Sequence, residues 1–192
     1  MTPYEAACAA IDRSNRGDPA GHELPYSQRM VEWTRTLAPG ASEELLLAVR
    51  AQHVCRWTVP RTKYPGGRAG YLAWRESLKK FHAETLAAAM KESGYPDASV
   101  AKAKALILRK NLASDPEGQT LEDAACLVFL QFEFAEFAAK TEDGKVVDIL
   151  RKTWQKMSPR AREAALVLPF EAREQALLGK ALSPVAGPDI VG

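Results

Sequence analysis

The sequence places three side chains that can bind a metal ion, His53, His82 and Asp123, on the expected inward faces of separate helices. Each continues an apolar helical stripe. His53 follows Leu46 and Val49, His82 lies between Leu78 and Leu86, and Asp123 precedes Leu127 and Leu130. Burying such a group without a partner costs about 1–3 kcal/mol, so each needs a hydrogen bond or a metal. Imidazole and carboxylate ligands suit a divalent ion such as manganese, iron or zinc, which we expect as the cofactor. The alternative is that the histidines donate to backbone carbonyls and that Asp123 caps a neighbouring group.

A basic and aromatic segment, residues 56–75, follows the first of these histidines and contains several glycines and prolines. Three arginines, Arg56, Arg61 and Arg68, lie in or next to the loop that we expect there. Guanidinium groups bind phosphate in a bidentate manner, and the interleaved aromatic residue Tyr64 could stack on a base or sugar. The basic pair Arg109 and Lys110 ends a later helix, where it could face a ligand or complement the helix dipole. The alternative is a solvated basic surface whose aromatic residues anchor the loop.

Two carboxylates adjoin the expected metal ligands. Glu84 comes two residues after His82, and Glu122 directly precedes Asp123. Either could act as a general base or orient a ligand, the alternative being a solvated helix carboxylate. The sequence contains no phosphate loop, no dinucleotide fingerprint and no serine–histidine–aspartate order.

Composition limits the class of protein. The chain has 192 residues, 46% of them hydrophobic, which suits one globular domain over residues 1–182 followed by a disordered tail at 183–192. A formal net charge of +2 does not by itself indicate nucleic acid or a membrane as partner. The three cysteines lack CxxC spacing and are expected to be reduced. Since no signal sequence is visible and the longest apolar run is short, we expect a cytoplasmic protein with no membrane association.

The periodicity predicts an all-α fold, a compact bundle of about seven to nine helices. The helices are expected at residues 3–15, 26–37, 43–57, 69–93, 97–111, 120–140, 146–157, 160–168 and 170–182. The third of these would carry His53 inward, and the sixth is apolar on nearly all sides at its start, as in a central helix.

Several segments resemble a bacterial and fungal family catalogued as domain of unknown function 4202. They are Tyr26-Ser-Gln-Arg-Met, Ala51-Gln-His-Val-Cys-Arg-Trp, Tyr64-Pro-Gly-Gly-Arg-Ala-Gly-Tyr, Phe81-His-Ala-Glu and Gln119-Thr-Leu-Glu-Asp-Ala-Ala-Cys-Leu-Val-Phe-Leu. The resemblance covers residues 5–168. It implies membership of that family without implying an activity.

The order of these motifs is also distantly similar to the HD-domain phosphohydrolases, all-α enzymes in which histidines and aspartates hold divalent metal. In this resemblance His53 matches the motif histidine, Asp123 the late aspartate and His82 the extra histidine of two-metal members. The chain departs from the pattern at Val54, where an aspartate is expected, and at Tyr26, where the first histidine is expected.

Together these features predict a metal-dependent, HD-like phosphohydrolase acting on a nucleotide or other small phosphate ester. In that reading the metal lies on His53, His82 and Asp123, and Glu84 or Glu122 moves the proton. The alternative is a non-catalytic module that binds nucleotide or RNA through segment 56–75. A third reading is a purely structural or partner-binding helical protein.

Overall fold

A computed structural model describes residues 1–109 and 115–183. Within these ranges the chain is helical, with ten α-helices and no strand. The predicted all-α class is confirmed, and the predicted seven to nine helices are too few. The chain divides into two compact units, Met1–Ala124 and Ala125–Gly192. The single domain expected over residues 1–182 stays a prediction.

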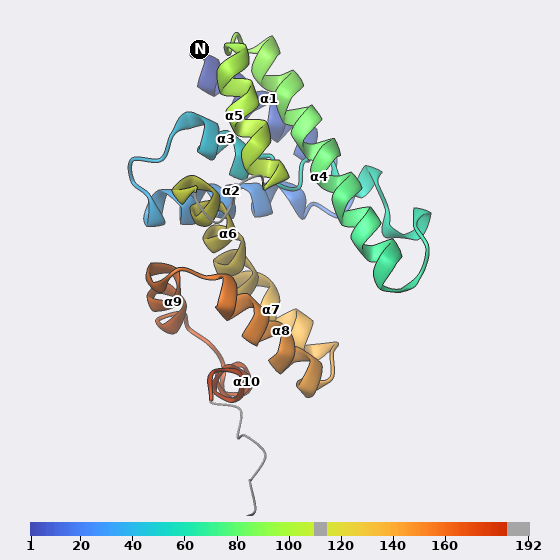
Figure 1. Cartoon of the computed structure of the whole chain (residues 1–192), viewed down its shortest axis with the longest axis vertical. Coiled ribbons are helices and arrows are strands. Elements are labelled where there is room, and N and C mark those ends of the chain that lie inside the picture. Colours follow the sequence, from blue (N-terminus) through green and yellow to red (C-terminus); the bar gives the residue numbers. More distant parts are fainter. Residues whose placement is uncertain (110–114, 184–192) are drawn as a thin grey trace, which may run out of the picture. The chain divides into compact units, whose positions relative to one another are not determined.

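The first unit contains five complete helices and the start of a sixth. They are α1 (Pro3–Asn15), α2 (Glu23–Leu37), α3 (Glu43–Arg50), α4 (Gly67–Glu92), α5 (Asp97–Leu108) and α6 (Pro116–Val128), with the 3-10 turns η1 (Arg56–Thr58) and η2 (Arg61–Lys63) between α3 and α4. Helices α4 and α5 lie side by side (Figure 1). The core of this unit includes Ile11, Met30, Leu47, Leu86 and Leu121. The connection between α3 and α4 forms a loop beside the N-terminal end of α4 (Figure 1).

Helix starts follow from the capping residues. Thr2 and Glu5 form a capping box on α1, and Ser42 accepts a hydrogen bond from the backbone N–H of Leu45 in α3. Helix α2 starts at Glu23, three residues before its predicted start. The carboxylate of Asp18 accepts hydrogen bonds from three backbone N–H groups, including that of Glu23, which stabilises the earlier start.

The predicted helix through residue 57 is wrong, because α3 ends at Arg50. The guanidinium of Arg50 holds the Asp12 carboxylate on α1 through Nε and Nη2, at 2.8 and 2.9 Å. Beyond it, residues 51–55 form turns, with the N–H of Arg56 donating to the carbonyl of His53. Cys55 is left-handed, with φ of 54°, which a continuing helix does not permit. His53 therefore lies on a turn and not on a helix face.

The second unit continues α6 and adds η3 (Phe129–Glu133), α7 (Phe134–Ala139), α8 (Asp143–Lys156), α9 (Pro159–Leu166) and α10 (Ala172–Leu182). The predicted continuous helix 120–140 is thus interrupted, since η3 is a π-helical turn. Its wider turn brings Phe129 and Phe134, five residues apart, into contact, with ring centroids 6.2 Å apart. Of the predicted tail, residues 184–192 lie outside the described residues.

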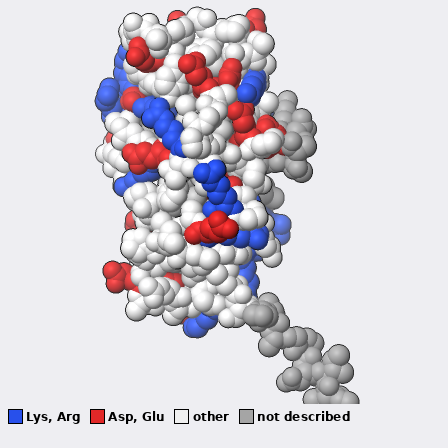
Figure 2. Space-filling model, turned by 90° about the vertical axis from the view of Figure 1, so that its left-hand side faces the viewer, with Lys and Arg blue, Asp and Glu red and all other residues white. Residues whose placement is uncertain are grey.

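Charged side chains are mixed on the surface. On the face drawn in Figure 2, basic and acidic side chains are interspersed and form no continuous basic patch. Among the described helices, none is both long and apolar enough to cross a membrane. The three cysteines are free thiols. The cytoplasmic location stays a prediction.

Candidate functional site

His53 is surrounded by three side chains in the first unit. Its ring stacks on Tyr26 of α2, with centroids 3.9 Å apart and an angle of 8° between the planes. Its Nδ1 lies 3.5 Å from a carboxylate oxygen of Glu23, and its Nε2 lies 2.9 Å from Nη1 of Arg56. We call these residues and His82, described below, the His53 cluster.

The contact with Arg56 assigns the tautomer of His53. A guanidinium can only donate, and Nη1 of Arg56 lies 2.9 Å from Nε2 but 3.4 Å from Nδ1, so we assign Nε2 as the acceptor and place the proton of the neutral ring on Nδ1. That N–H faces Glu23. Burial, followed by the charges of Arg56, Arg75 and Arg109, lowers the pKa of His53 well below its ordinary value. The ring is therefore neutral at physiological pH, although 24% of its side chain is exposed.

Glu23 is the carboxylate of the cluster. Burial raises its pKa to about 7, against the opposing effect of Arg56. Its position in the first turn of α2 is set by Asp18, whose carboxylate accepts from its backbone N–H. Burial would raise the pKa of Asp18, but its backbone hydrogen bonds outweigh that effect and lower it. Glu23 can therefore accept or release a proton near neutral pH.

His82 is buried on α4, as its apolar stripe predicted. Its Nδ1 donates to the carbonyl of Val54 at 2.9 Å, so the basic nitrogen is again Nε2. Burial, together with the neighbouring His53, lowers its pKa to about 3. The two imidazole centroids are 6.2 Å apart. This hydrogen bond also holds the turn that carries His53.

Three guanidinium groups act on the His53 ring, those of Arg56, Arg75 and Arg109. They come from three separate places, η1, the first half of α4 and the end of α5. Arg109 and Cys55 are the two non-glycine residues with positive φ within the described ranges. Such conformations are strained and gather at functional sites. Cys55 directly precedes Arg56 in the chain, and the second residue with positive φ is Arg109 itself.

Asp123 and Glu122 lie on α6 and are both buried. Asp123 accepts a hydrogen bond from Gln119 at 2.9 Å, and Glu122 forms an ion pair with Arg109. Over the described parts of the chain, no group of three or more His, Cys, Asp or Glu side chains is placed to hold a metal ion. The structure thus brings His53 and His82 together without assembling the predicted three-ligand set, and the metal stays a prediction.

The outer loop, residues 60–67, carries the other predicted phosphate ligands. Arg61 donates to the carbonyls of Tyr64 and Gly67 at 2.9 and 3.4 Å, so its guanidinium braces the loop. Arg68 is exposed at the start of α4, and Tyr64 is half-buried. A methyl group on Gly70 would lie 1.9 Å from the carbonyl oxygen of Pro65, so this close approach requires glycine.

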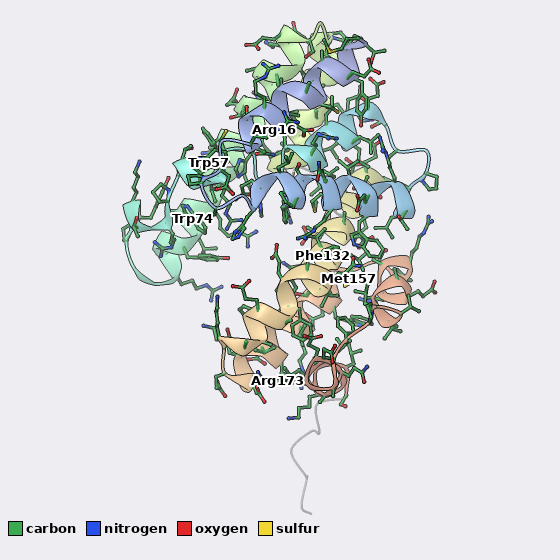
Figure 3. All side chains as sticks on the ribbon, turned by 180° about the vertical axis from the view of Figure 1, so that it is seen from behind. Arg16, Trp57, Trp74, Phe132, Met157 and Arg173 are labelled. Atoms are coloured by element: carbon green, nitrogen blue, oxygen red, sulfur yellow. The ribbon has the colours of Figure 1, made fainter. Side chains whose placement is uncertain are left out.

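Two tryptophans, Trp57 and Trp74, lie beside the connection between α3 and α4 (Figure 3). The indole N–H of Trp74 donates to the carbonyl of Val59 at 2.8 Å. The guanidinium of Arg56 lies over the Trp74 ring, 5.1 Å from its centroid. Trp57 lies against Gly17, where an added methyl group would meet the indole at 3.4 Å. Arg56 is thereby held between an imidazole and an indole.

The remaining predicted residues lie elsewhere or outside the description. Glu84 is exposed on α4 and pairs with Lys104, with Nζ and Oε1 2.7 Å apart. Its partner in the described structure is therefore Lys104 and not a residue of the His53 cluster. Lys110 lies outside the described residues. Sequence reasoning did not include Glu23, because the predicted helix began after it, and it left open whether Arg109 faces a ligand.

Comparison with known proteins identifies the family. The profile described as Domain of unknown function (DUF4202) matches residues 5–178. The chain belongs to this family. The match reaches into both compact units, so the family's domain includes the His53 cluster and most of the second unit. No curated protein and no solved structure matches the chain significantly.

Proposed function

We propose that the protein binds a nucleotide or other small phosphate ester at the His53 cluster. The observation that carries the proposal is the contact of the Arg56 guanidinium with the neutral His53 imidazole, beside which Arg75 and Arg109 are near enough for their charges to lower the pKa of the ring. Placing several guanidinium groups near one another costs free energy, because like charges repel. A bound anion would remove this cost. Phosphate oxygens suit guanidinium donors in both charge and geometry.

The charge balance supports an anionic ligand. Both histidines of the cluster are neutral, because burial lowers the pKa of each. Glu122 offsets Arg109, and Glu23, whose pKa is about 7, is only partly ionised near neutral pH. The positive charge of Arg56 and Arg75 therefore exceeds the negative charge beside it.

The geometry of Arg56 supports the same ligand. Among its contacts in the described structure, Arg56 reaches His53 through Nη1. Its position over the Trp74 ring holds the guanidinium in place, and a guanidinium has more N–H donors than the contact with His53 uses. A fixed guanidinium loses little side-chain entropy when it binds phosphate.

Isothermal titration calorimetry with inorganic pyrophosphate tests the proposal. Arg75 is exposed, so Arg75→Gln should fold normally and weaken pyrophosphate binding by about threefold to tenfold. Arg13→Gln removes an exposed arginine from α1 and should leave the affinity unchanged. Binding should weaken as salt rises from about 50 to 300 mM. Equal losses in both variants, or no binding by the folded wild type, would refute the proposal.

Metal-dependent hydrolysis of the bound ester, with an HD-like arrangement, is the second candidate. One observation favours it. The Nδ1 of His82 donates to the carbonyl of Val54, which is the arrangement found in metal-bound histidines. Since no three-ligand set is found among the described residues, we derive no metal-bound step.

Metal content measured by mass spectrometry separates the two candidates. The protein would be supplied with manganese, iron and zinc, and then compared with His53→Ala and Asp123→Ala. Near-stoichiometric metal lost in both variants supports hydrolysis. Pyrophosphate binding by metal-free protein supports a non-catalytic module. Binding of RNA but not of pyrophosphate would instead support the RNA alternative.

A further inference from the structure

A pair of aromatic rings adjoins the arginine cluster on α4. Tyr71 and Trp74 stand one helical turn apart, with ring centroids 6.0 Å apart and planes at 48°. Each ring carries a guanidinium. Arg56 lies 5.1 Å from the Trp74 centroid, and Arg75 lies 5.8 Å from the Tyr71 centroid. The rings and two of the three converging cations are therefore one continuous surface.

The Tyr71 ring is held in place but accessible. Its hydroxyl accepts a hydrogen bond from Nη1 of Arg75 at 3.2 Å, which fixes the ring relative to α4. Even so, 42% of Tyr71 is exposed, although large apolar surfaces are normally covered. Trp74 is fixed from behind by its hydrogen bond to Val59. Rigid, exposed aromatic rings beside cations are the elements with which proteins stack nucleobases.

We infer that the exposed Tyr71 ring, beside Trp74, is the platform for the nucleobase of a nucleotide whose phosphate lies on Arg56 and Arg75. This inference rests on the proposed function and narrows its ligand from phosphate esters in general to nucleotides. A sugar phosphate or a simple phosphate would leave the exposed Tyr71 ring uncovered. The flat base would instead bury it and gain stacking energy, while the phosphate binds the guanidinium groups.

The test compares two probes that differ by the base alone, adenosine 5′-monophosphate and ribose 5-phosphate, by calorimetry. The wild type should bind the nucleotide at least about fivefold more tightly, which is the lower end of the contribution of base–aromatic stacking. Tyr71→Leu should abolish this preference and leave the affinity for ribose 5-phosphate unchanged. Tyr71→Phe keeps the ring and should keep the preference.

Leu72→Ala is the matched control, because Leu72 is 53% exposed beside Tyr71 but has no aromatic ring. It should change neither affinity. Equal binding of both probes by the wild type, with both weakened by Arg56→Gln, would overturn the base platform and leave the phosphate site intact. Binding of neither probe would overturn both proposals. A Tyr71→Leu variant that weakens both probes equally would also overturn the platform.

Discussion

The two ends of the connection between α3 and α4 use arginine differently. In the His53 cluster, Arg56 contacts a neutral imidazole and an indole. In the outer loop, Arg61 donates to two carbonyls of its own loop. The sequence treats both as basic residues of one segment. We propose that Arg56 binds the ligand and that Arg61 braces its own loop, so charge alone does not identify a phosphate site.

His82 and His53 should separate into a structural and a binding residue. His82 is buried and holds Val54, so His82→Ala creates a cavity and leaves a buried carbonyl without a partner. We expect a loss of about 4 kcal/mol in the free energy of unfolding, measured with urea. His53→Ala should cost about 1 kcal/mol, because its ring is partly exposed.

His22 provides the histidine control, since it is exposed and has no side-chain cap bond. His22→Ala should change stability by less than about 0.5 kcal/mol. Equal losses in His53→Ala and His82→Ala, with pyrophosphate binding unchanged in His53→Ala, would favour the purely structural reading.

Gly70→Ala should disrupt the outer loop. The added methyl group would meet the Pro65 carbonyl at 1.9 Å, and both atoms belong to the backbone or are fixed to it. We expect a loss of about 3 kcal/mol in unfolding free energy. Gly66→Ala meets nothing within 4 Å and should lose less than about 1 kcal/mol. A tolerated Gly70→Ala would show that the loop is not packed in this way.

Glu23 and the two histidines should make opposite contributions to the pH dependence of stability. The folded-state pKa of His82, about 3, lies below its value in the unfolded chain, near 6.5. Its contribution to stability is therefore complete above about pH 6.5 and is lost as the pH falls. The lowered pKa of His53 has the same effect. Glu23, whose pKa is raised to about 7, stabilises below its unfolded value near 4.5 and loses this as pH rises. Between about pH 5 and 6.5 the histidine effect exceeds that of the single carboxyl.

Glu23→Gln removes the opposing contribution. Stability should therefore rise with pH more steeply than in the wild type, by up to about 1.4 kcal/mol per pH unit between about pH 5 and 6.5. Urea unfolding at several pH values measures the slope. Glu32→Gln replaces an exposed glutamate of the same helix and should leave the slope of stability against pH unchanged. An unchanged slope in Glu23→Gln would show that this carboxyl is not buried.

The helices were largely predictable because their caps and stripes are local. Thr2 and Ser42 start helices where the sequence predicted, and the serine–proline pair at residues 158–159 starts one within one residue of its predicted start. The end of α3 was not predictable, because it depends on the long-range pair between Arg50 and Asp12 and on the backbone of Cys55. The apolar periodicity of the sequence continues past Arg50, and it indicates neither the pair with Asp12 nor the left-handed backbone of Cys55.

The candidate site was predictable in residue types and only partly in geometry. His82 and Asp123 are inward because their stripes are helical, and Arg56 follows His53 in the chain. Glu23 gave no signal, since its role depends on Asp18 starting α2 early. The roles of Arg61 and Glu84 depend on which partners folding brings near them, a loop carbonyl and Lys104, which no spacing indicates.

Pyrophosphate binding by Arg56→Gln and Arg61→Gln, compared by calorimetry, tests the central claim most directly. Both variants remove one guanidinium from the same segment and keep a hydrogen-bonding side chain. The account predicts that Arg56→Gln weakens binding by about tenfold or more. Arg61→Gln should change affinity by less than about twofold, with its effect falling on loop stability. A larger loss in Arg61→Gln than in Arg56→Gln would contradict the account and place the phosphate site in the outer loop.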